Sequence, residues 1–262
     1  MTIEPATHDT ATANLTHIPF ETDAGVAERA AIGLIVLASD QTMEHEFRLI
    51  FTQQGVAYYE SRIPNSNSIT PETLKEMESL IEDRTAVILP GMPLDVVAFG
   101  CTSASMVIGE QAVFDKIKAA RPDVACTTPI TAAFAAFDAL GAKRIGVLTP
   151  YRQDINDFMR DYITERGYQV PVFGSFNEEN DSIAARISPA SIRDAIAQVA
   201  ATAELDAVFL SCTNLRLVEH VADIEQEIGI PVTSSNHAMA WHCLRLAGID
   251  EIQPQFGRLF EK

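Results

Sequence analysis

A nine-residue pattern that ends in Cys-Thr occurs twice in this 262-residue sequence. Residues 94–102 (LDVVAFGCT) and residues 205–213 (LDAVFLSCT) are identical at five of nine positions. An apolar segment that contains a glycine precedes each copy. Gly33 lies 68 residues before Cys101, and Gly146 lies 66 residues before Cys212. Features that recur in the same order at nearly equal spacing predict two structurally similar units.

Apolar runs alternate with amphipathic segments in both halves. Continuous apolar runs are typical of strands that are buried on both faces, and the amphipathic segments are typical of helices that cover a parallel sheet. The expected strands include 31–37, 56–61, 94–99 and 145–149, and the expected helices include 42–54, 104–120, 131–140, 236–247 and two that open at Thr70-Pro71 and Ser188-Pro189. The pattern predicts an α/β fold with two similar Rossmann-like lobes, whose mostly parallel sheets are related by a pseudo-two-fold axis.

The repeat also predicts how the chain divides. Residues 1–26 are polar and rich in Thr and Ala, which is typical of a flexible tail and unlike a secretory signal. We expect residues 27–128 together with 236–262 to form the first lobe, and residues 129–235 to form the second. The two helices at equivalent places of the repeat, 131–140 and 236–247, are expected to cross between the lobes.

Composition excludes several classes of function. The 36 acidic and 19 basic residues leave a formal charge of −17, which disfavours binding to nucleic acid or to an anionic membrane. The sequence has no dinucleotide-binding GxGxxG motif, no P-loop, no GxSxG nucleophile elbow and no CxxC pair. We therefore expect no cofactor and no metal, and four cysteines outside a disulfide framework favour a cytoplasmic location.

Cys101 and Cys212 each end a predicted strand. Ligands of open α/β sheets bind at the carboxyl ends of the strands, so a two-fold repeat is expected to place these thiols on opposite sides of one cleft between the lobes. Helices expected to begin near Ser103 and Asn214 would lower the thiol pKa values through their N-terminal N–H groups. Cys126 and Cys243 lack this symmetry, and we interpret both as structural.

Two thiols on opposite sides of a carbon can remove a proton from one face and return one to the other. The same pair could instead add sulfur to a double bond, allow rotation and eliminate. Four polar residues that follow the cysteines are candidates for holding a substrate carboxylate: Thr102, Ser103, Thr213 and Asn214. The alternatives are that these four only cap helices, that the thiols only pack, and that the chain is a non-catalytic, two-lobed metabolite-binding protein.

The sequence resembles the aspartate/glutamate racemase superfamily, and within it the maleate cis–trans isomerase and arylmalonate decarboxylase group. The similarity spans most of residues 28–250, and residues 37–48 (LASDQTMEHEFR) look most like ectoine utilisation proteins of the EutA type. The motifs that carry it are Gly33 to Val36, Ser39 to Glu44, Asp95 to Val97, Cys101 to Ser103 and Ser211 to Asn214. The resemblance implies a racemase-like fold and a cofactor-independent isomerase or racemase that acts on a small carboxylate or amino acid. It also implies a homodimer or homotetramer, and ectoine catabolism as one pathway in which the protein would act.

The resemblance also implies roles for individual residues. Cys101 matches the cysteine of the first lobe, the nucleophile or base, and Cys212 matches the opposing acid. Tyr151 matches a tyrosine that binds the substrate carboxylate in maleate isomerases. A substrate-binding asparagine of the second lobe falls near Asn180, in a register uncertain by one residue. His237 is a minor candidate for assisting proton transfer.

Two positions depart from the resemblance. Maleate isomerases have asparagine where this chain has Asp40, and an anion beside a dicarboxylate is unfavourable, so Asp40 favours a substrate with an ammonium group. The alternative is that Asp40 only caps the helix expected over 42–54. Decarboxylases of the group have glycine in place of the first cysteine, so the presence of Cys101 disfavours arylmalonate-type decarboxylation. Maleate isomerisation by covalent thiol addition is the other enzymatic alternative.

Overall fold

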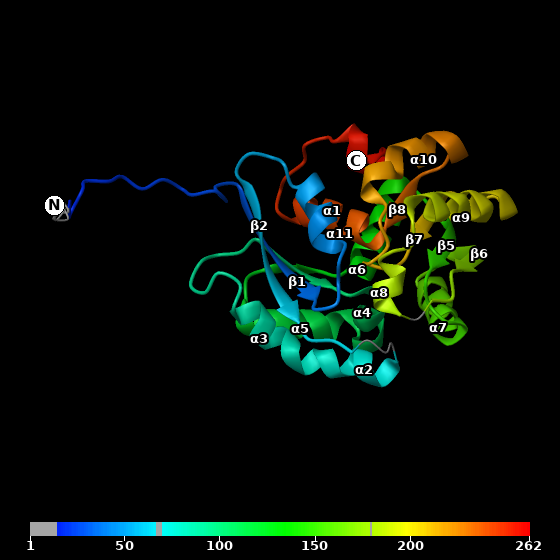
Figure 1. Ribbon diagram of the computed structural model, residues 1–262, viewed down its shortest axis with the longest axis horizontal. Helices are drawn as coiled ribbons and strands as arrows, with labels where there is room; N and C mark the ends of the chain where they lie inside the picture. The colour runs from blue at the N-terminus through cyan, green and yellow to red at the C-terminus, as the bar shows by residue number, and fades with distance from the viewer. Residues whose placement is uncertain (1–14, 67–69, 179) are drawn as a thin grey trace, which may run out of the picture.

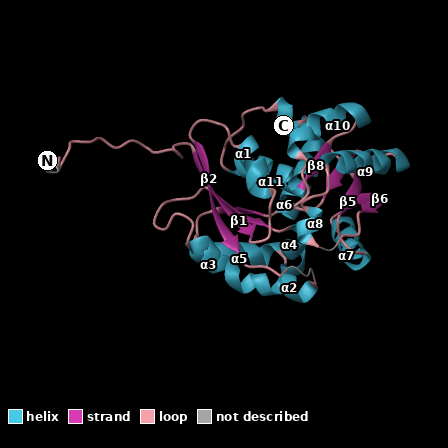
Figure 2. Cartoon of the chain, viewed as in Figure 1, coloured by secondary structure: helices cyan, strands magenta, loops and turns pink. Residues whose placement is uncertain are grey.

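The computed structural model describes residues 15–66, 70–178 and 180–262. These residues form two four-stranded parallel sheets with helices packed around them (Figures 1 and 2). The strand order is β2-β1-β3-β4 in one sheet and β6-β5-β7-β8 in the other, so each half of the chain builds the same arrangement. The predicted α/β fold with two similar lobes is confirmed.

The elements follow the order in which the repeat places them. The strands are β1 (Ala30–Leu37), β2 (Val56–Ile63), β3 (Val96–Gly100), β4 (Ala125–Thr127), β5 (Arg144–Thr149), β6 (Gln169–Ser175), β7 (Ala207–Leu210) and β8 (Val232–Ser234). The helices are α1 (Met43–Ile50), α2 (Pro71–Glu76), α3 (Ile81–Ala86), α4 (Thr102–Ile108), α5 (Glu110–Ala120), α6 (Pro129–Leu140), α7 (Gln153–Thr164), α8 (Asp181–Ala184), α9 (Pro189–Thr202), α10 (Val221–Ile228) and α11 (Ser235–Leu246). Short 3₁₀ turns lie at Met77–Leu80, Val218–His220, Pro254–Phe256 and Arg258–Glu261. No helix among the described residues is long and apolar enough to cross a membrane.

Strand β1 is buried on both faces, as its unbroken apolar run predicts. Ile32 and Leu34 face a core that α1, α6 and α11 complete. Ile35 and Leu37 face the opposite core, which is filled by side chains from α2 to α5. Helices therefore cover both faces of this sheet, and only the ends of its strands remain available for a binding site.

The repeated glycine and leucine are a packing pair. A Cβ atom on Gly33 would lie 3.2 Å from Leu94 Cδ1, and one on Gly146 would lie 2.5 Å from Leu205 Cδ1. Each leucine opens one copy of the nine-residue pattern, and each packs over the glycine of the neighbouring strand. A residue larger than glycine at either position would push this leucine out of its place, so both copies of the repeat keep the glycine–leucine contact.

The repeated aspartate ties the starts of neighbouring strands together. Asp95 Oδ2 accepts a hydrogen bond of 2.7 Å from the N–H of Ala31. Asp206 Oδ2 accepts bonds of 2.8 and 2.7 Å from the N–H groups of Lys143 and Arg144. The Leu-Asp part of the pattern therefore serves the fold, and only its Cys-Thr end reaches the strand ends where ligands bind.

Helices α6 and α11 pack against each other. Thr128 and Ser234 cap them at equivalent positions, because each hydroxyl accepts from the N–H three residues on. Side chains of α6 enter both cores, with Phe137 in that of the second sheet and Ala136 in that of the first. The division of the chain at residues 128 and 235 therefore stays a prediction.

The first part of the predicted N-terminal tail, residues 1–14, lies outside the described residues. The following segment runs away from the body of the protein (Figure 1). Its apolar side chains at Leu15, Ile18, Phe20 and Val26 are all exposed.

Two predicted helices are shorter than expected. The helix expected over 104–120 is divided into α4 and α5 at Gly109, whose φ of 94° breaks the helical ladder. The helix expected over 42–54 covers only Met43–Ile50, and a turn leads to Gly55, whose φ is 78°. Helix α2 begins at Pro71 with Thr70 as its cap, as predicted.

The helix expected to begin near Asn214 is absent, and this prediction is wrong. After Cys212 the chain forms a turn, and the next helical residues lie in the 3₁₀ turn that begins at Val218. The reason is a buried carboxylate from the other half of the chain. Glu46 Oε1, on α1, accepts hydrogen bonds of 2.6 and 2.9 Å from the N–H groups of Leu217 and Val218.

The carbonyl groups that would complete this helix are also occupied. Thr213 O accepts from Asn236 Nδ2 at 2.7 Å, and Asn214 O accepts from Thr42 Oγ1 at 2.9 Å. In an α-helix these two carbonyls would bind the N–H groups four residues on, which Glu46 holds instead. The side chains of Thr42, Glu46 and Asn236 therefore replace a helical turn, and the first two attach the loop after Cys212 to the first half of the chain.

We predict that Glu46→Ala destabilises the fold by at least about 2 kcal/mol, because it leaves two backbone N–H groups and one N–H of the Asn236 amide without an acceptor in a buried site. Glu46→Gln retains an acceptor oxygen and is expected to cost less. Urea unfolding followed by circular dichroism measures both, with exposed Glu82→Ala as a control within about 0.5 kcal/mol of wild type. A Glu46→Ala cost as small as that of the control would contradict the bridging role.

The same carboxyl predicts a pH dependence. Burial raises the pKa of Glu46 from 4.5 to about 7. The unfolded chain releases this proton at lower pH than the folded chain does, so the free energy of unfolding should fall as pH rises from about 4.5 through 7. Glu46→Gln should lack this fall in the free energy of unfolding. Urea unfolding of both proteins at pH 5 and at pH 8 measures it.

Candidate active site

Cys101 and Cys212 lie in the wall of one cavity. Cys101 follows β3 and caps α4, whereas Cys212 follows β7, and each is 4% exposed. Because parallel strands end at the same edge of a sheet, each sheet delivers one thiol to the cavity. The cavity is lined by Leu37, Asn65, Ser66, Thr73, Leu74, Met77, Cys101, Thr102, Ser103, Tyr151, Asp181, Cys212 and Thr213.

The cavity is small and only partly open to solvent. Its volume of about 30 Å³ holds one or two water molecules. Charges in such a space are poorly solvated, so each one is costly unless a partner compensates it. The protonation states of the thiols are therefore set mainly by burial.

Burial raises the pKa of Cys101 to about 11. The N–H of Ala104 and the hydroxyl of Ser103, 3.7 Å from the sulfur, act in the opposite direction. The negative charges of Asp181 and Asp40 raise the pKa further. The prediction of a lowered pKa at the start of a helix is therefore wrong, because the loss of hydration outweighs the helix N-terminus.

The pKa of Cys212 is also raised, first by burial and then by the charge of Asp181. The N–H of Asn214 and the hydroxyl of Tyr151 favour its thiolate by hydrogen bonding. Burial holds the pKa of Tyr151 well above its usual range, so its hydroxyl remains a donor. Tyr151 follows β5, and the structure brings this predicted residue to the cavity beside Cys212.

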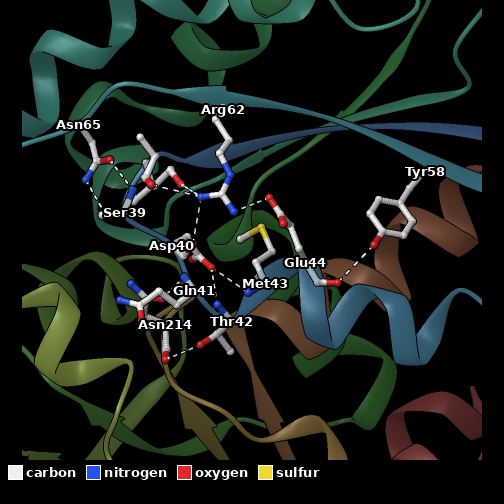
Figure 3. Close-up of polar contacts among 12 residues, drawn as sticks. Ser39, Asp40, Gln41, Thr42, Met43, Glu44, Tyr58, Arg62, Asn65 and Asn214 are labelled. Carbon is white, nitrogen blue, oxygen red and sulfur yellow. Dashed lines mark hydrogen bonds and ion pairs between the residues drawn. The ribbon is translucent and has the colours of Figure 1, made fainter.

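Three of the four polar residues that follow the cysteines also line the cavity: Thr102, Ser103 and Thr213. Thr102 Oγ1 pairs with Ser235 Oγ at 2.8 Å, which links α4 to α11. Asn214 is buried but does not line the cavity. Its Oδ1 accepts from the N–H of Gln41 at 2.8 Å, so it joins the two halves (Figure 3).

Asp40 is 3% exposed and lies just outside the cavity wall. Its Oδ1 accepts from the N–H groups of Thr42 and Met43, both at 2.8 Å, so it satisfies the first turn of α1 as the capping alternative predicted (Figure 3). Burial raises the pKa of Asp40 to about 6. The hydroxyl of Thr213 opposes this shift and connects Asp40 to the cavity wall.

Asn180 does not line the cavity. It is exposed, and its Oδ1 accepts from the N–H of Ile183, which caps α8. Asp181, one residue on, lines the cavity in its place, and its Oδ2 accepts from Ser39 Oγ at 2.5 Å. The sequence reasoning missed Asp181, and the one-residue uncertainty at Asn180 was the available signal.

His237 does not line the cavity either. Its Nδ1 pairs with Thr233 Oγ1 and its Nε2 with the carbonyl of Phe256, and burial lowers its pKa to about 4. Cys243 lies within the core on α11, and Cys126 is partly buried in β4. Among residues 15–66, 70–178 and 180–262, no group of three or more His, Cys, Asp or Glu side chains is placed to hold a metal ion.

We predict that alkylation of Cys101 by iodoacetamide accelerates about tenfold per pH unit from pH 7 to 10, because only the thiolate reacts and its pKa is about 11. Peptide mass mapping measures the rate at each pH. The same protein unfolded in urea provides the control, since its thiols should level off near their ordinary pKa of about 8.5. A plateau by pH 9 in the folded protein would show that burial does not govern this thiol.

The chain is similar to known proteins over most of its length. The family model described as arylmalonate decarboxylase matches residues 32–260. The maleate isomerase of Pseudomonas putida strain KT2440 is 28% identical over 242 residues, which cover 87% of this chain and 96% of that protein. The arylmalonate decarboxylase of Bordetella bronchiseptica is 30% identical over 139 residues, 52% of this chain and 58% of that protein.

Solved structures show the same fold. The maleate isomerase Iso of Pseudomonas putida S16 superposes with a TM-score of 0.81 at 23% identity, covering 88% of this chain and 98% of that one. A variant of the Nocardia farcinica maleate cis–trans isomerase, solved with a covalently bound succinylcysteine intermediate, superposes with a TM-score of 0.79 at 23% identity and the same coverage. The match to the family model extends over most of the chain, including both cysteines, and the chain therefore belongs to the arylmalonate decarboxylase family.

Proposed function

We propose that this protein is a cofactor-independent isomerase of a small carboxylate, in which Cys101 and Cys212 act on opposite faces of one substrate carbon. The observation that carries the proposal is the pair of buried thiols in the wall of a single small cavity. The relatives of the family are named as isomerases and a decarboxylase, which supports an enzyme rather than a metabolite-binding protein.

The chemistry needs no other reagent. One sulfur, as thiolate, takes a proton from the substrate carbon, and the electron pair moves into the adjacent carboxyl group. The opposite thiol then gives its proton to the other face of the carbon. Hydroxyl groups in the cavity wall, from Tyr151 and Thr102, are suited to stabilise the negative oxygen that forms.

Covalent isomerisation of maleate is the second candidate. The succinylcysteine in the Nocardia farcinica enzyme favours it, because that adduct is what thiol addition to maleate would produce. In this route one sulfur bonds to a vinyl carbon and a proton joins the other carbon. Rotation and elimination then release the trans isomer and restore the thiol. Decarboxylation is a weaker candidate, since Cys101 is present here.

The finer expectations remain predictions. A role in ectoine catabolism rests on the resemblance of residues 37–48, and a homodimer or homotetramer rests on the family resemblance. A cytoplasmic location rests on the cysteine pattern of the sequence. Light scattering of the purified chain measures the assembly directly.

We predict that Cys101→Ser and Cys212→Ser each lower kcat/KM by about 10³-fold or more, because a serine hydroxyl is far less acidic than a thiol. Proton NMR in D₂O follows a panel of maleate, aspartate, glutamate, 2,4-diaminobutyrate with its acetylated forms, and an arylmalonate. Cys126→Ser is the matched control and should retain wild-type turnover, since Cys126 does not line the cavity.

The single variants separate the alternatives. Retention of near-normal turnover by either cavity variant would contradict a two-thiol mechanism. A succinyl-sized mass increase on Cys101 during maleate turnover would select the covalent route. If the wild-type protein binds panel members without transforming any of them, it is a binding protein and the proposal fails.

A further inference from the structure

The described wall of the cavity holds a carboxylate and no cationic side chain. Asp181, at the start of α8, is 9% exposed and lines the cavity together with both cysteines. No lysine, arginine or histidine is present among the described residues that line it. A ligand therefore meets one negative charge that no cation of these residues balances, and this limits which carboxylates the site can take.

Hydrogen bonds from the other half of the chain hold Asp181 in the wall. Ser39 Oγ, after β1, donates to Asp181 Oδ2 at 2.5 Å. Asn65 Nδ2, after β2, donates to Ser39 Oγ at 2.8 Å, and Asn65 Oδ1 accepts from the N–H of Ser39 at 3.2 Å (Figure 3). Both partners are uncharged, so these bonds orient the carboxylate without neutralising it.

The charge of Asp181 acts on the groups that we propose to react. Burial is the largest cause of the raised pKa of Cys212, and the charge of Asp181 is the next. Burial is also the largest cause of the raised pKa values of Cys101 and Tyr151, and the charge of Asp181 contributes to both. A charge that acts on both thiols also acts on a substrate that lies between them.

Arg62 lies near the wall, but other groups occupy its guanidinium. Its Nη1 donates to the carbonyl of Leu37, which lines the cavity, and to those of Ala38 and Asp40. Its Nη2 donates to Glu44 Oε1 at 2.5 Å, and this ion pair balances its charge (Figure 3). Arg62 therefore holds the loop after β1 rather than a ligand.

A second carboxylate on the substrate is unfavourable in such a site. Two carboxylates a few ångströms apart repel strongly where little water screens them. Uncharged donors, such as the hydroxyls of Tyr151 and Thr102, can hold one carboxylate of a ligand. At the other end of the ligand, a group that donates a hydrogen bond would make the contact with Asp181 attractive instead of repulsive.

We propose that Asp181 selects the substrate by charge: the site takes a monocarboxylate whose other end donates a hydrogen bond to Asp181, and it rejects dicarboxylates. The inference rests on the proposed function and narrows its substrate class. It separates this chain from the relatives that are named maleate isomerases, since maleate is a dicarboxylate. Asp181 thus determines specificity by touching the substrate, whereas the two thiols carry the proton.

The test uses two probes of nearly the same shape. Maleate has two carboxylates, and maleamate has one carboxylate and one amide, whose N–H groups can donate to Asp181. Titration of the unfolding temperature with each probe, up to about 10 mM, gives the apparent Kd without turnover. Proton NMR in D₂O gives kcat/KM for conversion of each probe to its trans isomer. Both measurements are made at about pH 8, well above the ordinary pKa values of carboxyl groups.

Three variants separate charge from structure. Asp181→Asn keeps the size of the side chain and removes its charge. Ser39→Ala removes the orienting hydrogen bond and leaves the charge. Asp161→Asn, on the exposed side of α7, removes an equal charge outside the cavity wall and is the matched control. Circular dichroism establishes that each variant is folded before the comparison.

We expect the wild type to bind maleamate at least about tenfold more tightly than maleate, because only maleate brings a second negative charge to Asp181. Asp181→Asn should reduce this preference to within about threefold, chiefly by tightening the binding of maleate. Ser39→Ala and Asp161→Asn should both keep the wild-type preference. The ratio between the probes is the measure, since a change in the thiols affects both probes alike.

Three results would overturn the inference. The first is a wild type that binds maleate as tightly as maleamate, a comparison that needs no variant. The second is a loss of the preference in Ser39→Ala or Asp161→Asn as complete as that in Asp181→Asn, because the charge at residue 181 would then not be its cause. The third is that neither probe stabilises the wild type or Asp181→Asn.

Turnover separates this inference from the proposed function. If the wild type isomerises maleate with a kcat/KM at or above that for maleamate, the two-thiol isomerase stands and the selection by charge is wrong. If the wild type prefers maleamate in binding, Asp181→Asn loses this preference, and neither probe nor any member of the wider panel turns over, the selection by charge is supported and the isomerase proposal fails.

Discussion

Parallel strands end at one edge of their sheet, and in this protein two such edges meet around a single cavity. The interior of each sheet is covered by helices and closed to ligands, so the strand ends are the places where reactive side chains can gather. The repeat therefore has two parts with different purposes. Its glycine and Leu-Asp residues build the sheets, and its terminal cysteines, Cys101 and Cys212, form the site.

The two halves are alike in topology but differ where the chemistry occurs. A helix follows Cys101, whereas the chain after Cys212 is held in a turn by Glu46 from the opposite half. The sulfur of Cys101 is favoured as a thiolate by a helical N–H and Ser103, and that of Cys212 by the N–H of the turn and Tyr151. The asymmetry gives the two thiols different surroundings, which suits the base and acid roles that we propose for them.

Burial sets the resting state of the site. A narrow cavity of about 30 Å³ gives either thiolate little hydration, and the nearby carboxylates oppose ionisation further. Both thiols are therefore protonated at neutral pH.

The sequence by itself determined the two-fold α/β architecture and the strand-end positions of Cys101 and Cys212, because hydrophobic periodicity and an ordered repeat specify the elements and their sequence along the chain. Tyr151 was singled out only by the resemblance to maleate isomerases. It could not reveal Asp181, whose place in the wall depends on a cap by the neighbouring Asn180 and on a bond from Ser39 in the other half. It also predicted a helix after Cys212 and low thiol pKa values. Only the tertiary structure decided these points, because long-range side chains satisfied the backbone of that turn and because the extent of burial outweighed the local helix N-terminus.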